Sequence, residues 1–302
     1  MQTISFVSAS GGAGKTLLSI LTAGALAIKG KKVLFLDLDP SASATLYLLD
    51  DYVEDCNLKT LMKDLVDKSL GRAKKELNVE SCLHRHKVLG AERASFDLLP
   101  GGNLEDIRSD IQNVSNWRDL LEMLVNPLRD HYDYAIVDAP NWVFPLFPMT
   151  VNLSSYYIVM SRPGPSEITK TKVFLERIFL IMKNQFGIDQ PQLHAFVVLN
   201  QFRSNMHAEE VEREGKRAYE ELMRAFYGIK TAHLEERKNY YGNKPSEFWG
   251  FKYLEDFRID SYKEKGHILA RREGPPTLQF RAYMDALDKF LEEVTPYSVK
   301  RE

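Results

Sequence analysis

The chain has 302 residues, of which 44% are hydrophobic, enough to build a sizeable core in one large α/β domain or two small ones. Its formal net charge of −2 excludes a globally basic coat for nucleic acid, so any DNA binding has to come from a local patch. The sequence shows no repeats, no stretch as long as a membrane span and no signal peptide, so we expect one continuous cytoplasmic domain without a membrane partner.

Six short apolar runs alternate with helical segments along the chain. Because these runs are continuously apolar rather than alternating, they predict strands of a parallel sheet that is covered on both faces. The runs occupy residues 3–8, 33–38, 96–99, 133–137, 156–160 and 194–199. An apolar helix predicted at 15–29 connects the first two runs and ends at Gly30. The pattern predicts an α/β fold, a doubly wound and mostly parallel sheet flanked by helices, with ligands at the carboxyl edge of the strands.

Two segments are predicted as helical insertions into a single domain that spans residues 1–302. Residues 57–92 are charged and predicted helical, and residues 203–257 combine a predicted helix with an aromatic-rich stretch. The aromatic residues either pack locally or form a contact surface; they are Tyr240, Tyr241, Phe248, Trp249, Phe251, Tyr253 and Phe257. An amphipathic helix at about 278–294 is predicted to dock on the domain.

Cys56 and Cys82 are the two cysteines of the sequence. They lie far apart and outside any CxxC pattern, which disfavours a zinc or iron–sulfur site and a disulfide framework. We therefore expect two structural thiols in a reducing compartment.

The residues Ser8 to Leu17, SASGGAGKTL, follow the first apolar run and have the pattern of a phosphate-binding loop. Glycines allow backbone N–H groups to close around phosphate oxygens, Lys15 can reach the β- and γ-phosphates, and the Thr16 hydroxyl can bind Mg²⁺. The general pattern has glycine where this chain has Ala9, and a glycine-rich turn by itself is more often structural. The predicted nucleotide contacts are Ser10, Gly11, Gly12, Ala13, Gly14, Lys15, Thr16 and Leu17.

Acidic and amide side chains follow three other predicted strands. Asp37 and Asp39 end the second run, where one carboxylate can orient water and the other can help to hold the metal, although such pairs are often loop caps. Asp138 is in the expected place for a residue that holds Mg²⁺ through water, or else it ends the strand in a turn. Asn200 ends the last run, and its amide can pair with an adenine edge.

Together these motifs resemble those of the ParA/MinD family of deviant Walker A ATPases, which position chromosomes, plasmids and other cargo. The similarity covers residues 1–200 and, loosely, 258–294. It rests on the phosphate loop, the DxDPQ-type turn, the Walker B segment and the VLN strand end, at residues 10–16, 37–41, 138–141 and 198–200.

This resemblance implies ATP and Mg²⁺ as cofactors and a homodimer that forms on ATP binding. It implies catalytic roles for Lys15, Asp37 and Asp39, of which Asp39 positions the attacking water, and metal contacts from Thr16, Asp39 and Asp138. It also implies a cargo- or centromere-binding protein that stimulates turnover.

Position 10 departs from the family pattern. There the family has a signature lysine that crosses the dimer to the partner's phosphates, whereas this chain has Ser10. A cation on the phosphates is worth roughly 10³ to 10⁵ in turnover in related systems, so we expect slow hydrolysis unless another cation substitutes. Arg162, Arg271 and Arg272 are the candidates. Ser41 replaces the glutamine of the second motif, and the Walker B turn has one proline fewer, so partner sensing is expected to differ too.

Three functions remain open at this point. The first is an ATPase that segregates DNA or places cargo and binds DNA non-specifically on the nucleoid. Its candidate contacts are Lys170, Lys172, Arg177, Lys263, Lys265, Arg271 and Arg272. The second is a nucleotide-dependent scaffold that hardly hydrolyses ATP, and the third is a P-loop ligase or amidotransferase of cofactor synthesis, for which the sequence offers no second catalytic constellation.

Overall fold

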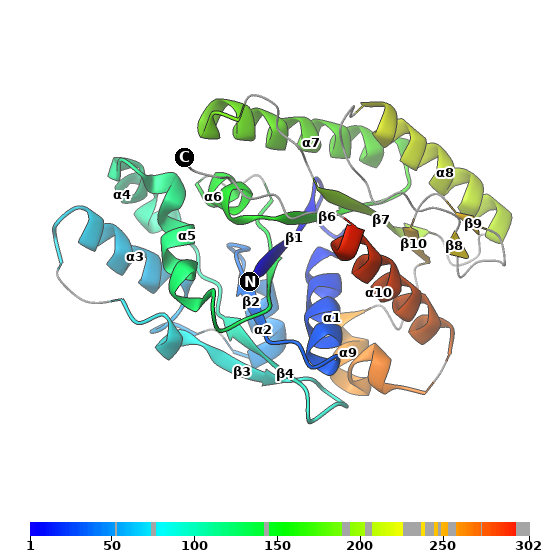
Figure 1. The fold of residues 1–302 in the computed structure, drawn as a ribbon, viewed down its shortest axis with the longest axis horizontal. Coiled ribbons are helices and arrows are strands. Elements are labelled where there is room, and N and C mark those ends of the chain that lie inside the picture. Colours follow the sequence, from blue (N-terminus) through cyan, green and yellow to red (C-terminus); the bar gives the residue numbers. More distant parts are fainter. Residues whose placement is uncertain are drawn as a thin grey trace.

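A central sheet lies between two layers of helices (Figure 1). The computed structural model describes residues 1–51, 53–73, 77–141, 145–188, 194–202, 207–225, 237–238, 245–246, 249–252, 258–272 and 274–293. Helices on both faces of the sheet confirm the predicted α/β class.

Eight strands form this sheet. They are β1 (Gln2–Ser8), β2 (Val33–Asp37), β3 (His84–Lys87), β4 (Ser95–Leu99), β5 (Tyr134–Asp138), β6 (Tyr156–Ser161), β7 (Ala195–Phe202) and β10 (Trp249–Lys252). Their order is β10-β7-β6-β1-β5-β2-β4-β3, and all neighbours are parallel except β3 and β4, which are antiparallel. The six predicted runs correspond to β1, β2, β4, β5, β6 and β7, so the mostly parallel, doubly wound sheet is confirmed. The short strands β8 (Arg237–Lys238) and β9 (Pro245–Ser246) pair separately.

Ten α-helices are present in the described part of the chain. They are α1 (Lys15–Ile28), α2 (Ser43–Leu49), α3 (Leu58–Ser69), α4 (Arg108–Asn113), α5 (Leu120–Val125), α6 (Leu146–Leu153), α7 (Pro165–Phe186), α8 (Ala208–Ala225), α9 (Ile259–Lys265) and α10 (Pro275–Glu293). Helices α1, α2, α9 and α10 share one apolar core with the sheet, and α3 to α8 share the other. Successive residues of a strand point to opposite faces of the sheet: Ile136 packs in the first core, and Ala135 and Val137 pack in the second.

The two insertions contain more strand than the sequence indicates. Among the described residues of the segment 57–92, α3 is the α-helix, and the prediction that this segment is helical was wrong at β3, which forms an antiparallel edge of the sheet. Side chains of β3 alternate between half-buried and exposed, so this strand lacks an apolar run. In the second insertion α8 is present, but β10 joins the sheet beside β7.

The fate of the aromatic-rich stretch is mostly undetermined. Of its residues Trp249 and Phe251 lie in β10, and the other five lie outside the described residues.

The carboxy-terminal helix packs against α1 and the sheet. Helix α10 buries Phe280, Tyr283, Leu287 and Phe290 in the core that it shares with α1. Nowhere in the described part of the chain is there a helix long and apolar enough to span a bilayer.

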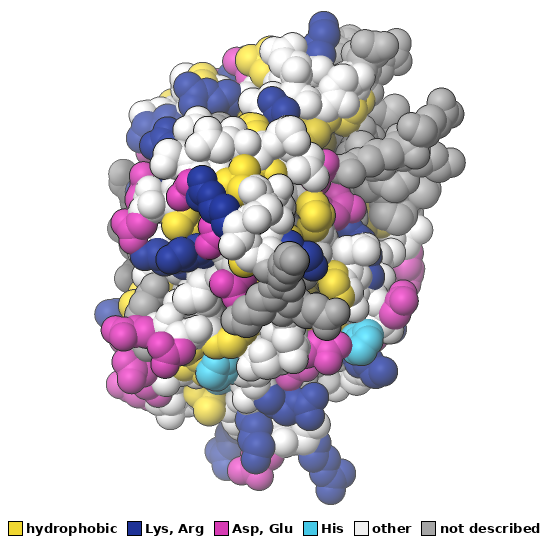
Figure 2. All heavy atoms as spheres, turned by 90° about the vertical axis from the view of Figure 1, so that its left-hand side faces the viewer, with side chains coloured by type: hydrophobic (Ala, Val, Ile, Leu, Met, Phe, Trp, Pro, Cys, Tyr) yellow, Lys and Arg dark blue, Asp and Glu magenta, His cyan; other side chains and the backbone are white. Residues whose placement is uncertain are grey.

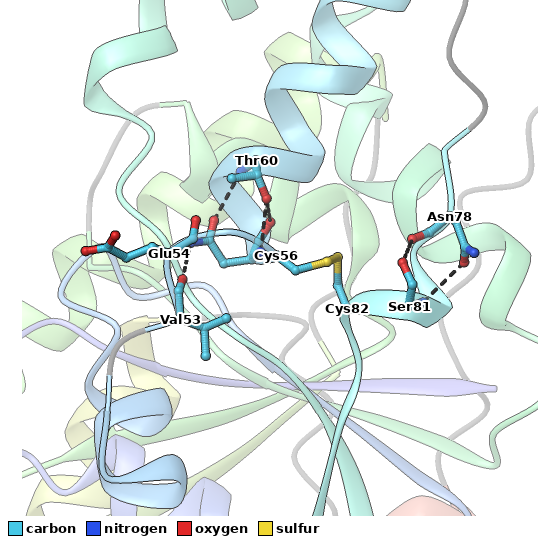
Figure 3. Close-up of a disulfide and its surroundings, with 8 residues drawn as sticks. Val53, Glu54, Cys56, Thr60, Asn78, Ser81 and Cys82 are labelled. Carbon is cyan, nitrogen blue, oxygen red and sulfur yellow. Dashed lines mark hydrogen bonds between the residues drawn. A yellow bond between two sulfur atoms is a disulfide. The ribbon is translucent and has the colours of Figure 1, made fainter.

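The two cysteines are paired, so the expectation of two separate thiols was wrong. Cys56 and Cys82 form a disulfide between the start of α3 and a short 3₁₀ turn at Glu80–Cys82 (Figure 3). The cysteines are 26 positions apart in the sequence, and the chain between them runs out along α3 and returns, which brings the two Cα atoms to 5.0 Å. The spacing of the two cysteines in the sequence does not predict that the chain turns back in this way.

Candidate functional site

A cavity of about 490 Å³ opens at the carboxyl edge of the sheet, above the loop between β1 and α1. Its walls include that loop, the segment after β2 and the start of α9. The lining residues are Ser8, Ser10, Gly11, Gly12, Ala13, Gly14, Lys15, Thr16, Leu17, Asp39, Ser43, Tyr47, Asn141, Gln201, Arg258, Ile259 and Asp260. All eight predicted phosphate-loop contacts thus lie on one concave surface.

Two glycines of the loop have backbone conformations that other residues rarely adopt. The φ angles are +71° at Gly12 and +89° at Gly14. Helix α1 begins directly after Gly14, and the Leu18 N–H donates to the Gly14 carbonyl. The first N–H groups of α1 have no earlier helical carbonyl to bind, so the helix start favours an anion.

Lys15 is buried at the base of the cavity and paired with carboxylates from two neighbouring strands. Its Nζ donates to Asp138 Oδ1 at 2.8 Å and to Asp39 Oδ2 at 3.5 Å. Burial alone would lower the pKa of Lys15, but the charge and hydrogen bond of Asp138, followed by the charge of Asp39, raise it above its ordinary value. Lys15 therefore keeps its positive charge at neutral pH.

Thr16 and Asp138 together suit a magnesium site. The Thr16 hydroxyl donates to Asp138 Oδ2 at 2.7 Å, and Asp138 is fully buried at the end of β5. Mg²⁺ in proteins is typically held by one or two carboxylates, substrate phosphates and water, so a hydroxyl beside a carboxylate fits it. Within the described residues no group of three His, Cys, Asp or Glu side chains could hold a metal. A magnesium ion here would accordingly need nucleotide and water as further ligands.

Asp39 and Asp37 lie in different surroundings although they are two residues apart. Asp39 lines the cavity and accepts hydrogen bonds from the Ser41 N–H and hydroxyl. Burial raises the pKa of Asp39, but the Ser41 hydrogen bonds and the charge of Lys15 outweigh burial, so the net pKa is lowered. Asp39 is therefore an ionised carboxylate that faces the cavity.

Asp37 is fully buried and does not line the cavity. Its Oδ2 accepts hydrogen bonds from the Thr45 N–H and hydroxyl, at 2.8 and 2.7 Å, and its Oδ1 accepts one from the Asp39 N–H. Burial, followed by the charge of Asp138, raises the pKa of Asp37 to about 7. This carboxyl holds the Asp39 segment and α2 in place; the catalytic role that we expected for it stays a prediction.

Side chains at the ends of β6 and β7 donate hydrogen bonds to backbone carbonyls of the phosphate loop. Asn200 donates to the Ala13 carbonyl at 2.9 Å, and Gln201 donates to the Gly12 carbonyl at 2.6 Å. Arg162, just after β6, donates to the same Gly12 carbonyl at 3.0 Å and to Gln201 Oε1 at 2.8 Å. Asn200 thus contacts the loop rather than the cavity in this structure, and its predicted contact with adenine remains untested.

Arg162 is the candidate cation that lies at the phosphate loop. Ser10 donates to Glu167, and the hydrogen bond from Lys170 together with that from Ser10 and the charge of Arg162 lowers the pKa of Glu167. The Arg162 guanidinium also donates to the Gly11 carbonyl at 3.4 Å, one residue from position 10. Neither Arg162 nor Arg272 lines the cavity, but Arg162 donates to the phosphate loop, whereas Arg271 is engaged with the carbonyls of Ser261 and Gly266.

Sequence reasoning missed part of the cavity wall. Ser43 and Tyr47 come from α2, and Arg258, Ile259 and Asp260 come from the start of α9, more than 200 residues later. The position of Ser43 two residues after the second motif could have suggested it. The α9 residues carry no motif that points to a nucleotide.

Three of the seven candidate DNA contacts form ion pairs with acidic side chains. Lys170 pairs with Glu167, Lys172 with Glu221, and Lys263 with Asp50. Figure 2 shows Lys and Arg side chains interspersed with Asp and Glu on the face that it displays.

A glycine-rich loop that leads into a helix with Lys15 and Thr16, after the first strand of a parallel sheet, defines a P-loop nucleotide-binding protein. The AAA_31 family model, described as an AAA domain, matches residues 1–188. The chain belongs to this family, within which it is related to ParA- and MinD-type ATPases.

Two curated relatives illustrate this relationship. Over 170 residues the chain is 29% identical to the virulence plasmid ParA family protein pGP5-D of Chlamydia psittaci, covering 56% of this chain and 60% of that protein. Over 141 residues it is 30% identical to the maintenance of carboxysome distribution protein A of Synechococcus elongatus, covering 46% and 50%. The match thus spans only half to three fifths of these relatives.

Solved structures share the fold over nearly the whole chain. Apo McdA of Cyanothece has a TM-score of 0.67 at 18% identity and covers 95% of this chain and 99% of its own. Cobyrinic acid a,c-diamide synthase of Mycobacterium smegmatis, with bound ADP and magnesium, has a TM-score of 0.64 at 16% identity and covers 98% of each chain. At these identities the likeness concerns the fold alone.

Proposed function

We propose that this chain binds ATP with Mg²⁺, hydrolyses it, and acts as a ParA-like ATPase in the partition of DNA or the positioning of another cargo. The observation that carries the proposal is the Lys15 ammonium between Asp138 and Asp39 at the base of the cavity. The family match and the ParA relative support it.

The site residues divide the work as follows. Loop N–H groups and Lys15 bind the phosphates, so that phosphate oxygens replace Asp138 as partners of Lys15. Thr16 and Asp138 would hold Mg²⁺, which would supply positive charge to the phosphates. Asp39, ionised and facing the cavity, accepts a hydrogen bond from the attacking water and orients it. Arg162 compensates for the missing lysine at position 10.

The partners are proposed on the family relationship. They are a second copy of the chain bound on ATP, non-specific DNA, and a cargo- or centromere-binding protein that stimulates turnover, in the cytoplasm and on the nucleoid. A DNA mobility shift that requires ATP and Mg²⁺ and weakens with salt is expected. Equal binding with and without nucleotide would contradict the DNA part.

A scaffold that hardly hydrolyses ATP is the second candidate, and Ser10 favours it. The deciding experiment measures binding of a fluorescent ATP analogue and multiple-turnover phosphate release by the wild type and by Asp39→Ala. We expect both to bind and only the wild type to turn over. Binding with equal, negligible release from both would instead establish the scaffold.

The third candidate is a P-loop enzyme of cofactor synthesis. The synthase fold likeness supports it no further than the shared architecture. Its cavity would need a second substrate beside the nucleotide, whereas the described lining holds one group of catalytic type, around Lys15 and Asp39.

A further inference from the structure

The disulfide joins two segments of unequal exposure. Cys82 is buried, whereas Cys56 is partly exposed at the start of α3 (Figure 3). Their Cα separation of 5.0 Å is one that a disulfide spans without backbone movement. An attacking thiolate needs access to one sulfur atom, and Cys56 is the less buried of the two cysteines.

Cys56 directly precedes the residue that caps α3. Asn57 Oδ1 accepts from the Thr60 N–H at 3.1 Å, and the Asn57 N–H donates to the Thr60 hydroxyl at 3.0 Å. This capping box fixes the first turn of α3 next to the disulfide. Any displacement of Cys56 therefore also displaces the first turn of α3.

The start of α3 packs against the loop that follows β4. The Leu58 N–H donates to the Pro100 carbonyl at 2.9 Å. At Gly102 the approach is so close that a Cβ atom would lie 2.9 Å from Asn57 Oδ1. The Pro100–Gly102 loop thus has little freedom to move independently of α3.

The same loop supports the acidic edge of the nucleotide cavity. The Gly101 N–H donates to the Thr45 hydroxyl at 2.8 Å, and Thr45 donates through its own N–H and hydroxyl to Asp37. A Cβ atom at Gly101 would lie 2.9 Å from Asp37 Cγ. A continuous set of contacts therefore runs from Cys56 to Asp37 and on to Asp39.

We propose that Cys56 and Cys82 are a reversible thiol–disulfide site, and that the closed disulfide fixes the Pro100–Gly102 loop beneath Asp37. The co-reactants are a small dithiol for opening and a small disulfide for closing. In opening, a dithiol thiolate attacks the Cys56 sulfur, the S–S bond breaks, and Cys82 leaves as a thiolate that takes a proton. The second thiol of the reductant then displaces Cys56 as a thiol, and the reductant leaves as its disulfide.

The consequence for nucleotide rests on the proposed function. The closed disulfide already restricts the motion of the Pro100–Gly102 loop under Asp37. ATP binding to the closed form therefore costs less conformational entropy, and the closed form binds ATP more tightly. A coupling of this kind amounts to about fivefold or more in affinity.

The test uses the full chain, equilibrated with oxidised or reduced dithiothreitol. Differential alkylation and mass spectrometry count the free thiols, and hydrogen exchange follows peptides that cover residues 37–49 and 96–104. We expect pairing that is reversible in the folded protein, slower exchange of both peptides in the oxidised form, and tighter binding of a fluorescent ATP analogue. The double variant Cys56→Ser with Cys82→Ala is the matched control and should not respond to redox state.

The possible contrary results distinguish between the parts of the proposal. Thiols that never pair, or a disulfide that opens only on unfolding, overturn the reversible site. Equal exchange of the two peptides in both forms overturns the coupling, and so does equal nucleotide affinity. If neither form binds nucleotide, the proposed function fails, while hydrogen exchange still decides whether the disulfide fixes the loop.

Discussion

Lys15 holds a buried positive charge whose partners come from other strands, and its removal leaves Asp138 buried without that partner. We expect Lys15→Met to lower the free energy of unfolding by about 3 kcal/mol and to abolish nucleotide binding. Adding Asp138→Asn to this variant should recover most of the stability but not the binding. Urea denaturation and titration with a fluorescent ATP analogue check this, and a stable, binding Lys15→Met protein would contradict it.

Asp37 gives the folding free energy a pH dependence. The pKa of Asp37 is about 7 in the folded chain against an ordinary value of 3.8, so the folded state holds a proton that the unfolded chain releases. The stabilisation from Asp37 is complete below about pH 4 and is lost as pH rises to about 7, by at most about 1.4 kcal/mol per pH unit.

Asp37→Asn should remove this part of the pH dependence, because its oxygen keeps both Thr45 hydrogen bonds and it does not titrate. Urea denaturation between pH 4 and 8 provides the measurement. The exposed Asp130 is the matched control, and Asp130→Asn should follow the wild type. A wild-type curve unchanged by Asp37→Asn would show that the carboxyl is ionised in the folded protein.

Arg162 is expected to influence turnover more than stability. If it compensates for the missing lysine, Arg162→Ala lowers multiple-turnover phosphate release by about tenfold or more. Arg272→Ala, which removes an exposed arginine outside the cavity, is the control and should turn over like the wild type. Ser10→Lys should restore turnover to the Arg162→Ala protein. Full activity of Arg162→Ala alone would contradict a role for the Arg162 guanidinium in turnover.

At the scale of elements, the phosphate loop depends on where its glycines meet β7. A Cβ atom at Gly14 would lie 2.4 Å from Asn200 Nδ2, and the φ of +89° disfavours any side chain. We expect Gly14→Ala to cost about 1 to 3 kcal/mol and to weaken nucleotide binding. Gly11→Ala meets no atom within 4 Å and should leave the thermal unfolding midpoint nearly unchanged. Equal midpoints for the two variants would contradict this account.

The two strands of the eight-stranded sheet that the sequence did not predict, β3 and β10, lie at its edges. Strand β3 has the polar sequence HRHK and one neighbour, so its pairing with β4 determines its conformation. Strand β10 pairs with β7 across some fifty residues of chain. The central strands were predictable because both of their faces are buried and each therefore appears as an apolar run.

At the scale of the whole molecule, the phosphate loop and Asp39 line one open cavity, and the proposed function includes a dimer that forms on ATP binding. We expect ATP with Mg²⁺ to convert a 34.7 kDa monomer into a dimer, most completely in Asp39→Ala, which cannot hydrolyse the ATP that holds the dimer together. Light scattering after size exclusion measures the mass. Lys15→Met should stay monomeric, and an unchanged Asp39→Ala mass would contradict nucleotide-dependent dimerisation.

The sequence by itself determined the parallel sheet, the phosphate loop and the acidic residues after β2 and β5, because each depends on neighbouring residues along the chain. Only the tertiary structure decided the pairing of Cys56 with Cys82, the contact of Arg162 with Gly12 and the presence of Arg258 in the cavity wall. These depend on how distant segments return to the same edge of the sheet. The contrast between Asp37 and Asp39 has the same origin: both follow one strand, but burial by α2 and the Pro100–Gly102 loop separates a supporting carboxyl from one that faces the cavity.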